Sequence, residues 1–371
     1  MSKVTRQESS EPMLHAVTPY GRRGGSSRVR VHEWVDRTTA ICSVTDYIGH
    51  CDASAGHLAG HAREVAGSER TLRRLAAVAS SRLLLHREAS PLSRGALECR
   101  LLRSAEFAVY DLDDALYEDH GQGGVLRRWA PKSQKAEYCA RAADRVVAGN
   151  ALLADWASQR NGDVVVVPSC VATERYRTKS DYAGGDVPRL VWIGSRDNEA
   201  HLRLLTGPLL ELHRRVGARL TLIGTLQPRL GALEELIDRV AWSEDVQHTT
   251  LADADVGLMP LPDDAYSRGK CGYKLLQYAA AAIPFVASPV GVNAAILHQF
   301  GMPAPVAADE WIDALLQLLG AASDREALGR QARRVVDRDW SYDAWLPAWE
   351  AAVGVRHQQL TPSVEPSEGQ E

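Results

Sequence analysis

Short apolar segments alternate with longer amphipathic segments along most of the chain from about residue 82. Alternation of this kind is typical of parallel strands joined by crossover helices. In the first half we expect strands at residues 29–31, 39–44, 82–85, 107–110, 145–147 and 164–167, with helices at 68–79, 91–103, 131–143 and 151–159. Residues 164–167 are all valine and stop at Pro168, which favours a buried parallel strand.

A polar stretch at residues 173–188 follows, with two glycines, a proline at its end and no apolar period, so we expect a linker between domains. A second series of alternating apolar and amphipathic segments follows. It predicts strands at 190–193, 219–223, 256–259 and 285–287, with helices at 200–216, 228–239, 274–281 and 311–319. Three tryptophans at positions 340, 345 and 349 are expected to anchor the last segment by packing on the protein body.

These patterns predict an α/β protein with two Rossmann-like parallel-sheet domains facing across a cleft. The first domain is expected at residues 28–172 and the second at 189–340, with a helix at 341–360 that returns to the first domain. Residues 1–27 and 361–371 are polar and lack apolar periodicity, so we expect both ends to be disordered.

Composition narrows the function without defining it. A chain of 371 residues is long enough for two domains with proper cores. No apolar run reaches the roughly 18 residues of a membrane-spanning helix, and no signal-peptide core is present, so a cytoplasmic protein is predicted. The six cysteines form no C-x-x-C pair, and the net charge of −4 gives no general attraction for nucleic acid or anionic membranes. Any phosphate recognition must therefore be local.

Ligands of open parallel sheets bind beyond the carboxyl ends of the strands, so the residues after each second-domain strand are candidates. Gly194-Ser195-Arg196 offers a tight turn, free amides and a guanidinium, which suits a diphosphate but also an ordinary turn. Gly224 follows the next expected strand, at 219–223. A longer loop then carries Lys270 and Lys274 into a helix start, where the helix dipole favours anions. From charge alone, a solvated basic turn remains open.

At this loop the sequence resembles the retaining glycosyltransferases of family 4, which have the GT-B architecture. The matching segments are 255–261, 268–278 (RGKCGYKLLQY) and 283–293, supported by 146–150, 167–171 and 175–176. The likeness covers roughly residues 82–353. It is weakest before residue 80, where we do not find the glycine pair that often follows the first strand of this family.

The resemblance implies a nucleotide diphosphate-sugar on the second domain and no cofactor or essential metal. It assigns Arg196 and Lys270 to the leaving diphosphate as catalytic groups. The implied donor-binding residues are Gly194, Ser195, Lys274, Gln277, Gly224, Gly291, Val292 and Asn293. Gln277 stands where the family usually has a glutamate against the ribose, and an amide is a weaker acceptor than a carboxylate. The family's other glutamate, which contacts the donor sugar, has no clear counterpart.

An acidic segment follows an expected first-domain strand, with Asp111, Asp113 and Asp114 at its start. It fits a divalent metal, a helix-capping turn or a cationic substrate. The resemblance argues against the metal and places this strand end across the cleft from the donor, together with His86, Arg87 and Glu88. An acidic pocket favours a protonated amine, so we expect an aminocyclitol or aminosugar acceptor, as in aminoglycoside antibiotic assembly.

The predicted function is retaining transfer of a sugar, from a UDP-sugar by preference, to a hydroxyl of a small acceptor. Two other classes stay open: an epimerase or hydrolase acting on the same donor, and a noncatalytic partner subunit. A nicotinamide enzyme is disfavoured, because no G-x-G-x-x-G opens either half.

Overall fold

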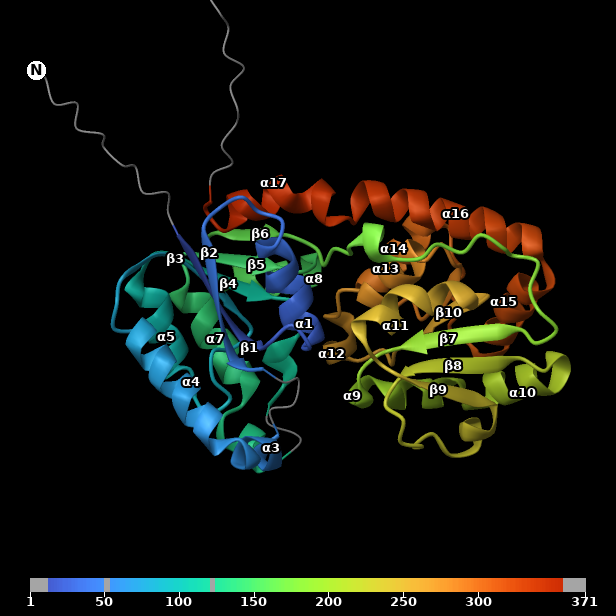
Figure 1. Ribbon diagram of the computed structural model, residues 1–371, viewed down its shortest axis with the longest axis horizontal. Coiled ribbons are helices and arrows are strands. Elements are labelled where there is room, and N and C mark those ends of the chain that lie inside the picture. Colours follow the sequence, from blue (N-terminus) through green and yellow to red (C-terminus); the bar gives the residue numbers. More distant parts are fainter. Residues whose placement is uncertain (1–12, 50–53, 121–123, 356–371) are drawn as a thin grey trace, which may run out of the picture.

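The computed structural model describes residues 13–49, 54–120 and 124–355, which form two domains side by side (Figure 1). The first domain has a sheet of order β2-β1-β3-β4-β5-β6, and the second has a sheet of order β11-β10-β7-β8-β9. Every neighbouring pair of strands in both sheets is parallel. The predicted α/β fold with two Rossmann-like domains is thus confirmed.

The first domain runs from β1 to β6. Its strands are β1 Leu14–Tyr20, β2 Cys42–Ile48, β3 Ser80–His86, β4 Ala105–Leu112, β5 Arg145–Ala148 and β6 Val164–Val166. A helical run follows β1, made of α1 Gly25–Ser27, a π-helical turn Arg28–His32 and α2 Glu33–Val35. The other helices are α3 Ala55–Gly60, α4 Ala62–Leu75, α5 Ala96–Ser104, a short 3₁₀ turn Leu116–Glu118, α6 Val125–Trp129, α7 Lys132–Ala142 and α8 Ala151–Ser158.

The second domain begins at β7 after residues 173–188, in which a short 3₁₀ turn, Thr173–Arg175, is the helical part. Its strands are β7 Arg189–Ile193, β8 Arg219–Gly224, β9 Ile237–Ala241, β10 Val256–Met259 and β11 Phe285–Ala287. Its helices include α9 Arg196–Glu199, α10 Thr206–Val216, α11 Glu244–Thr249, α12 Ala265–Arg268, α13 Tyr273–Ala280, α14 Val292–Phe300 and α15 Ala308–Gly320. Three 3₁₀ turns complete it, at Ala200–Leu205, Gly231–Leu236 and Leu251–Asp253.

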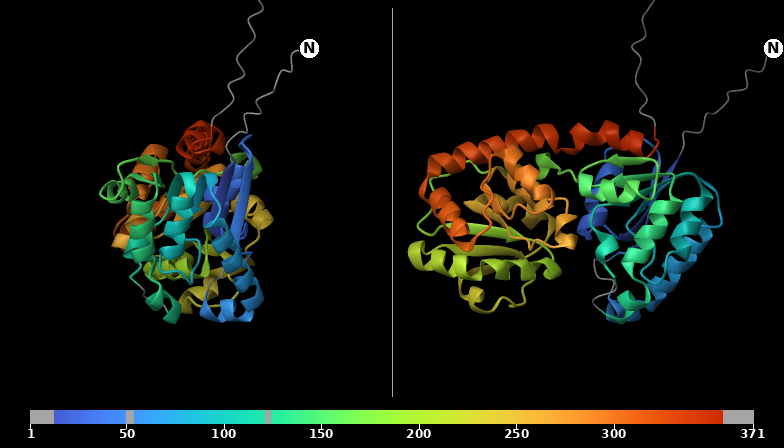
Figure 2. Two further views of the ribbon diagram at one scale, coloured as in Figure 1. Left: turned by 90° about the vertical axis from the view of Figure 1, so that its left-hand side faces the viewer. Right: turned by 180° about the vertical axis from the view of Figure 1, so that it is seen from behind.

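Each sheet separates two apolar cores because successive residues of a strand point to opposite faces. In β3, Leu83 and Leu85 pack in one cluster of the first domain, and Leu84 packs in the other. In β7, Val191 and Ile193 lie on one side of the second sheet, and Trp192 lies on the other. Both domains are therefore three-layered, with helices covering both faces of the sheet (Figure 2).

The last two helices join the domains, as expected. Helix α16, Ala322–Asp339, runs over the second domain, and α17, Tyr342–Ala352, lies on the first (Figure 1). Trp349 stacks on Trp34 with ring centroids 5.5 Å apart, and Tyr342 meets the edge of Trp34 at 4.6 Å. Large aromatic surfaces of this kind stabilise a docked helix strongly. The expected packing role is confirmed for Trp349, which is 1% exposed.

The start of the chain corrects the prediction of disorder at 1–27. Residues 14–20 form β1, which pairs with both β2 and β3, and Leu14, Ala16 and Val17 are fully buried. The segment at 29–31, which was expected to be a strand, is helical instead. The prediction failed because Arg30 is buried, so the polar residue in this segment does not mark an exposed face. The first domain therefore includes residues 14–27, which were expected to lie outside it. Residues 1–12 and the predicted disordered tail at 361–371 lie outside the described residues.

Two edge strands also differ from expectation. Residues 228–239 were expected to be helical, but β9 occupies Ile237–Ala241 and pairs with β8 alone, with Ile237 in one core of the domain and Val240 against the other. Strand β6 was expected to be buried, but it lies at the sheet edge and Val166 is 41% exposed. Edge position, which only tertiary structure defines, explains both errors.

Candidate active site

The ends of β7 and β8 approach each other closely on the side of the second domain that carries the candidate donor residues. A Cβ atom added at Gly224 would lie 2.8 Å from the carbonyl oxygen of Gly194, and one added at Gly194 would lie 3.0 Å from Cε of Lys274. A Cβ at Gly194 would also lie 2.6 Å from the Trp192 ring, and contacts under 3.0 Å are not tolerated by real side chains, so both positions require glycine. The structure therefore brings Gly194, Gly224 and Lys274 together.

Lys270 and Lys274 lie on either side of the start of α13. Gly272 caps this helix with a φ of +65°, and its turn directs the chain from the loop that carries Lys270 into the first helical turn that carries Lys274. The Lys274 ammonium lies over the Trp192 ring at 5.4 Å, and that of Lys270 lies over the Tyr266 ring at 4.9 Å. His201, which follows α9, feels the charge of both lysines.

These three basic side chains, the cationic cluster of Lys270, Lys274 and His201, crowd one another. Burial lowers the pKa of Lys274 to about 7, and the Lys270 ammonium acts in the same direction, while Asp114 opposes both. Burial also lowers the pKa of His201 to about 4, with Lys270 and Lys274 adding to the effect. An anion bound here would oppose these shifts and favour the protonated forms of Lys274 and His201.

The loop before α13 is held from behind by residues 291–293. Gly291 has a φ of +57°, and a Cβ there would lie 2.2 Å from the carbonyl oxygen of Arg268. Asn293 is fully buried and donates to the Ser288 carbonyl oxygen at 3.3 Å, and Val292 begins α14. The structure therefore places Gly291, Val292 and Asn293 as supports of the loop.

The predicted donor-binding residues Gln277 and Ser195 and the predicted catalytic Arg196 are not among the groups that shift the pKa of Lys274 or His201. Gln277 is buried and donates to the Tyr176 hydroxyl at 3.1 Å, so its amide already has a protein partner. Arg196 and Ser195 are exposed at the start of α9, and Ser195 Oγ accepts from Asn198 at 3.0 Å. Among the described residues, no ion pair joins Arg196 to a carboxylate.

The first-domain residues form a buried series of ion pairs. Arg30 binds Asp111 at 2.5 Å, and Nδ1 of His86 lies 2.7 Å from the same carboxylate. Arg87 binds Asp113 at 2.5 Å. Burial alone would raise the pKa of Asp111 and of Asp113, but the neighbouring cations outweigh burial and hold both pKa values below the usual range.

Asp111, Asp113 and Glu88, which we expected beside the acceptor or the donor sugar, are all paired with cations of the chain itself. Glu88 is buried against Lys132 at 3.2 Å and against Lys135, and these ammonium groups outweigh burial and lower its pKa to about 2. Because each carboxylate has a cation of the chain's own, the segment carries little unpaired charge with which to attract an amine. Within the described residues, no group of three His, Cys, Asp or Glu side chains is arranged as a metal site.

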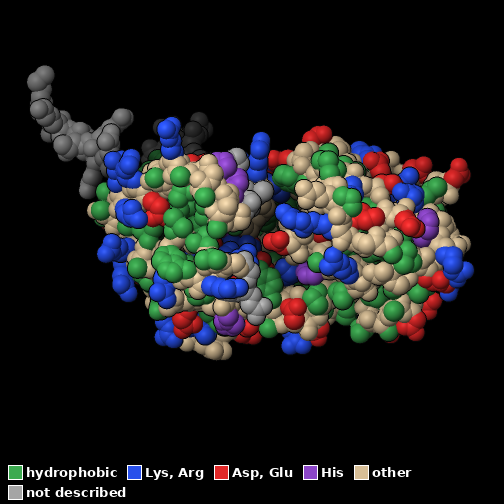
Figure 3. Space-filling model, turned by 90° about the horizontal axis from the view of Figure 1, so that it is seen from below, with side chains coloured by type: hydrophobic (Ala, Val, Ile, Leu, Met, Phe, Trp, Pro, Cys, Tyr) green, Lys and Arg blue, Asp and Glu red, His purple; other side chains and the backbone are tan. Residues whose placement is uncertain are grey.

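Asp114 differs from its neighbours because it reaches the second domain. Its carboxylate accepts from Arg87 at 3.0 Å and from the Tyr266 hydroxyl at 3.4 Å, and it lies 3.8 Å from Nζ of Lys270. Around it the domains touch through Asn150, which donates to the Gly269 carbonyl at 3.0 Å, and Cys271, whose thiol lies 3.1 Å from the Asp113 carbonyl. The loop of Lys270 thus packs directly on strand ends of the first domain. Figure 3 shows the hollow between the domains with basic side chains along it.

Sequence reasoning missed a glycine loop and an arginine in the first domain. Gly24 and Gly25 follow β1 and lead into the helical run Gly25–Val35, so they are the glycine pair that was not found before residue 80. Arg28 on this run is buried, donates to Gln247 at 3.2 Å and lies over the Trp242 ring at 5.1 Å, both in the second domain. The order of strand, glycine loop and helix at residues 14–35 was the available signal.

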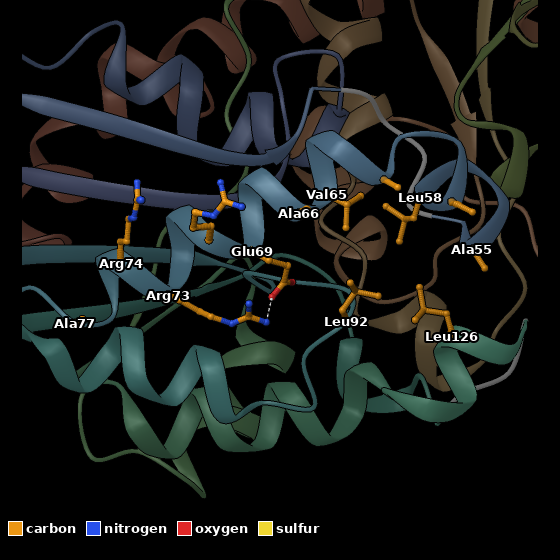
Figure 4. A pocket seen from close by; sticks show the side chains of 13 residues that line it. Ala55, Leu58, Val65, Ala66, Glu69, Arg73, Arg74, Ala77, Leu92 and Leu126 are labelled. Carbon is orange, nitrogen blue, oxygen red and sulfur yellow. Dashed lines mark hydrogen bonds and ion pairs between the residues drawn. The ribbon is translucent and has the colours of Figure 1, made fainter.

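A cavity of about 820 Å³ lies elsewhere on the first domain, along α3 and α4. Its walls are mostly alanine and leucine, including Leu58, Leu92 and Leu126, with arginines at one end (Figure 4). None of the residues discussed above lines it, so it is separate from the candidate active site.

The comparisons with known proteins agree with this geometry. Residues 187–321 match the family of group 1 glycosyl transferases. Sucrose-phosphate synthase from Thermosynechococcus elongatus has a similar structure, with a TM-score of 0.63, 12% identity, and coverage of 92% of this chain and 98% of that one. WaaG, a glycosyltransferase involved in lipopolysaccharide biosynthesis, has a TM-score of 0.63 and 16% identity, and the match covers 92% of this chain and 99% of that one. HepE from Anabaena, in complex with UDP and glucose, has a TM-score of 0.62 and 13% identity, and the match covers 93% of this chain and 100% of that one.

The protein therefore has the GT-B fold of these glycosyltransferases. Its second domain carries the sequence pattern of the group 1 family, and the two findings together support glycosyl transfer. No curated protein matches the chain in sequence. None of the helices in the described ranges has both the length and the apolar character needed to cross a bilayer.

Proposed function

We propose that the protein is a retaining glycosyltransferase that moves a sugar from a nucleoside diphosphate, with UDP preferred, to a hydroxyl of a small acceptor. The observation that carries the proposal is the cationic cluster of Lys270, Lys274 and His201 beside the glycine-lined ends of β7 and β8. Backbone close enough to require glycine, together with basic side chains that a bound anion keeps protonated, suits a diphosphate. The preference for UDP rests on HepE, whose structure holds UDP.

In this proposal the cluster stabilises the leaving group. As the bond from the sugar to the diphosphate breaks, negative charge grows on the diphosphate, and Lys270 neutralises it from the loop before α13. Arg196, on the exposed start of α9, swings onto the same phosphates. In retention without an enzymic nucleophile, the acceptor hydroxyl attacks from the face that the diphosphate leaves, so the departing phosphate can take the hydroxyl proton. Such preorganised charge is worth several kcal/mol in a cleft from which water is excluded.

The acceptor binds on the first domain in this proposal, opposite the donor. For an aminocyclitol or aminosugar acceptor the first-domain carboxylates offer little free charge, because Asp114 is paired with Arg87 in the same way as its neighbours are paired with other cations of the chain. Neutral sugars are therefore tested beside amino sugars.

A donor and acceptor panel tests the proposal. UDP-glucose, UDP-galactose, UDP-N-acetylglucosamine and GDP-mannose are first ranked by thermal shift, since a ligand at 100 times its Kd stabilises the folded state by about 2.7 kcal/mol. Each binder is then mixed with neutral and amino sugars, the products are read by mass spectrometry, and the anomeric configuration is read by NMR. A joined product with retained configuration is expected. Nucleotide release without an acceptor would indicate a hydrolase. An isomerised donor would indicate an epimerase, and binding without any reaction would indicate a noncatalytic partner subunit.

The low pKa of Lys274 gives a pH dependence of binding. A bound diphosphate raises this pKa from about 7, so binding takes up a proton wherever free Lys274 is neutral. The affinity for UDP should therefore fall as the pH rises above about 7, by up to about tenfold per unit. Isothermal titration in two buffers of different ionisation enthalpy measures the uptake. Lys274→Arg stays charged and should lose the effect, and an unchanged pH dependence in this variant would count against the assignment.

A further inference from the structure

Asp114 supplies an internal anion to the cationic cluster. We propose that its carboxylate competes with the donor's diphosphate for Lys270, and that its return to Lys270 after transfer helps to expel the nucleoside diphosphate product. This inference rests on the proposed function, because it assumes that Lys270 binds a diphosphate.

The contact between Asp114 and Lys270 is close enough to matter and loose enough to exchange. The two charged groups are 3.8 Å apart, and the side chains are only 15% and 14% exposed. A tight ion pair of ammonium and carboxylate is about 2.8 Å long, so this pair lacks a short hydrogen bond. At partial burial the attraction is still substantial, because solvent screens it weakly.

Asp114 does not depend on Lys270 for its position. Its other oxygen accepts from Arg87 at 3.0 Å and from the Tyr266 hydroxyl at 3.4 Å. Arg87 is itself fixed by Asp113 at 2.5 Å. When Lys270 turns to a diphosphate, Asp114 therefore keeps two partners and remains within reach, ready to bind Lys270 again.

The carboxylate opposes every bound diphosphate, donor and product alike, because it competes for the same ammonium group. One carboxylate cannot neutralise Lys270 and Lys274 together, and the pKa of Lys274 stays low in spite of it. A diphosphate carries more negative charge than Asp114 and displaces it. Since every bound diphosphate has to give up the free energy of the Asp114 contact, its affinity is lowered and its release is faster. Product release limits turnover in many enzymes, so a competitor of this kind is useful.

The test measures the affinity for UDP and for inorganic pyrophosphate by isothermal titration calorimetry in the full-length protein. Asp114→Asn should bind both ligands about tenfold tighter, which is an ordinary size for a coupling between two sites. The sign is diagnostic, because a variant that merely damages the site binds more weakly. Asp263→Asn is the matched control: Asp263 lies on the loop that carries Lys270, is 62% exposed and pairs with Arg268, so its loss should change the affinity less than twofold.

A double-mutant cycle separates competition for Lys270 from a general effect of charge. In the Lys270→Met background, Asp114→Asn should leave the pyrophosphate affinity unchanged. A tenfold gain that persists without Lys270, or equal affinities of wild type and Asp114→Asn, overturns the inference. If pyrophosphate behaves as expected but neither UDP nor any other nucleoside diphosphate binds, the proposed function falls while the competition stands. If no ligand binds, both fall.

Discussion

Replacing Lys270 with methionine is expected to lower kcat/KM for sugar transfer by about 100- to 1000-fold, the effect of removing one preorganised group that stabilises developing charge. The loss should lie mainly in kcat, because negative charge on the diphosphate is greatest in the transition state. Methionine keeps most of the length and apolar surface of lysine, so packing over the Tyr266 ring is retained. Steady-state kinetics with the donor identified by the panel measures both constants.

Arg268→Ala provides the matched control for this loss. Arg268 lies two positions before Lys270, is 53% exposed and binds Asp263 at 2.6 Å, away from the cationic cluster. Its removal should change kcat/KM less than about threefold, since exposed ion pairs contribute little. Both variants should unfold at the temperature of the wild type. Near-normal turnover of Lys270→Met would show that the leaving group is stabilised elsewhere, for example by Arg196.

The second domain could be predicted well because its site is encoded locally. The predicted strands at 256–259 and 285–287 have the same bounds as β10 and β11 in the structure. Gly194 and Gly224 lie where the backbone approaches other atoms too closely for a side chain. The loop between β10 and α13 keeps its glycines and lysines within a few residues of one another. Sequence spacing therefore fixes much of the geometry, and the cluster needed only His201 from a distant segment.

The first domain could not be predicted in the same way because its order depends on partners far along the chain. Arg30 and Asp111 are 81 positions apart, and only their pairing allows a guanidinium to sit inside the core. Without that knowledge, residues 21–27, which are only glycine, arginine and serine, have the composition of a disordered end. For the same reason Asp111, Asp113 and Glu88 were interpreted as available to a substrate, since the sequence shows the charges but does not show which opposite charge each one pairs with.

The pairing of Asp111 leads to the second large expected effect, which concerns stability. Asp111→Asn should lower the free energy of unfolding by about 3–5 kcal/mol, because it leaves Arg30, 1% exposed, without its countercharge. The folded-state pKa of Asp111 is depressed, so its contribution is fully present above pH 4 or so and is lost as the pH falls through that lower pKa. Urea unfolding at neutral pH measures the loss.

Asp163→Asn is the comparison variant, because Asp163 also pairs with an arginine, Arg145 at 2.8 Å, but is 44% exposed and should cost no more than about 1 kcal/mol. Activity measured beside stability distinguishes the two roles that a buried aspartate at a strand end can have. If Asp111 has a structural role, Asp111→Asn lowers the free energy of unfolding, and the fraction of the variant that remains folded is still active. If Asp111→Asn instead unfolds like the wild type while kcat/KM falls by orders of magnitude, Asp111 contacts the substrate, and the ion pair with Arg30 opens during the reaction.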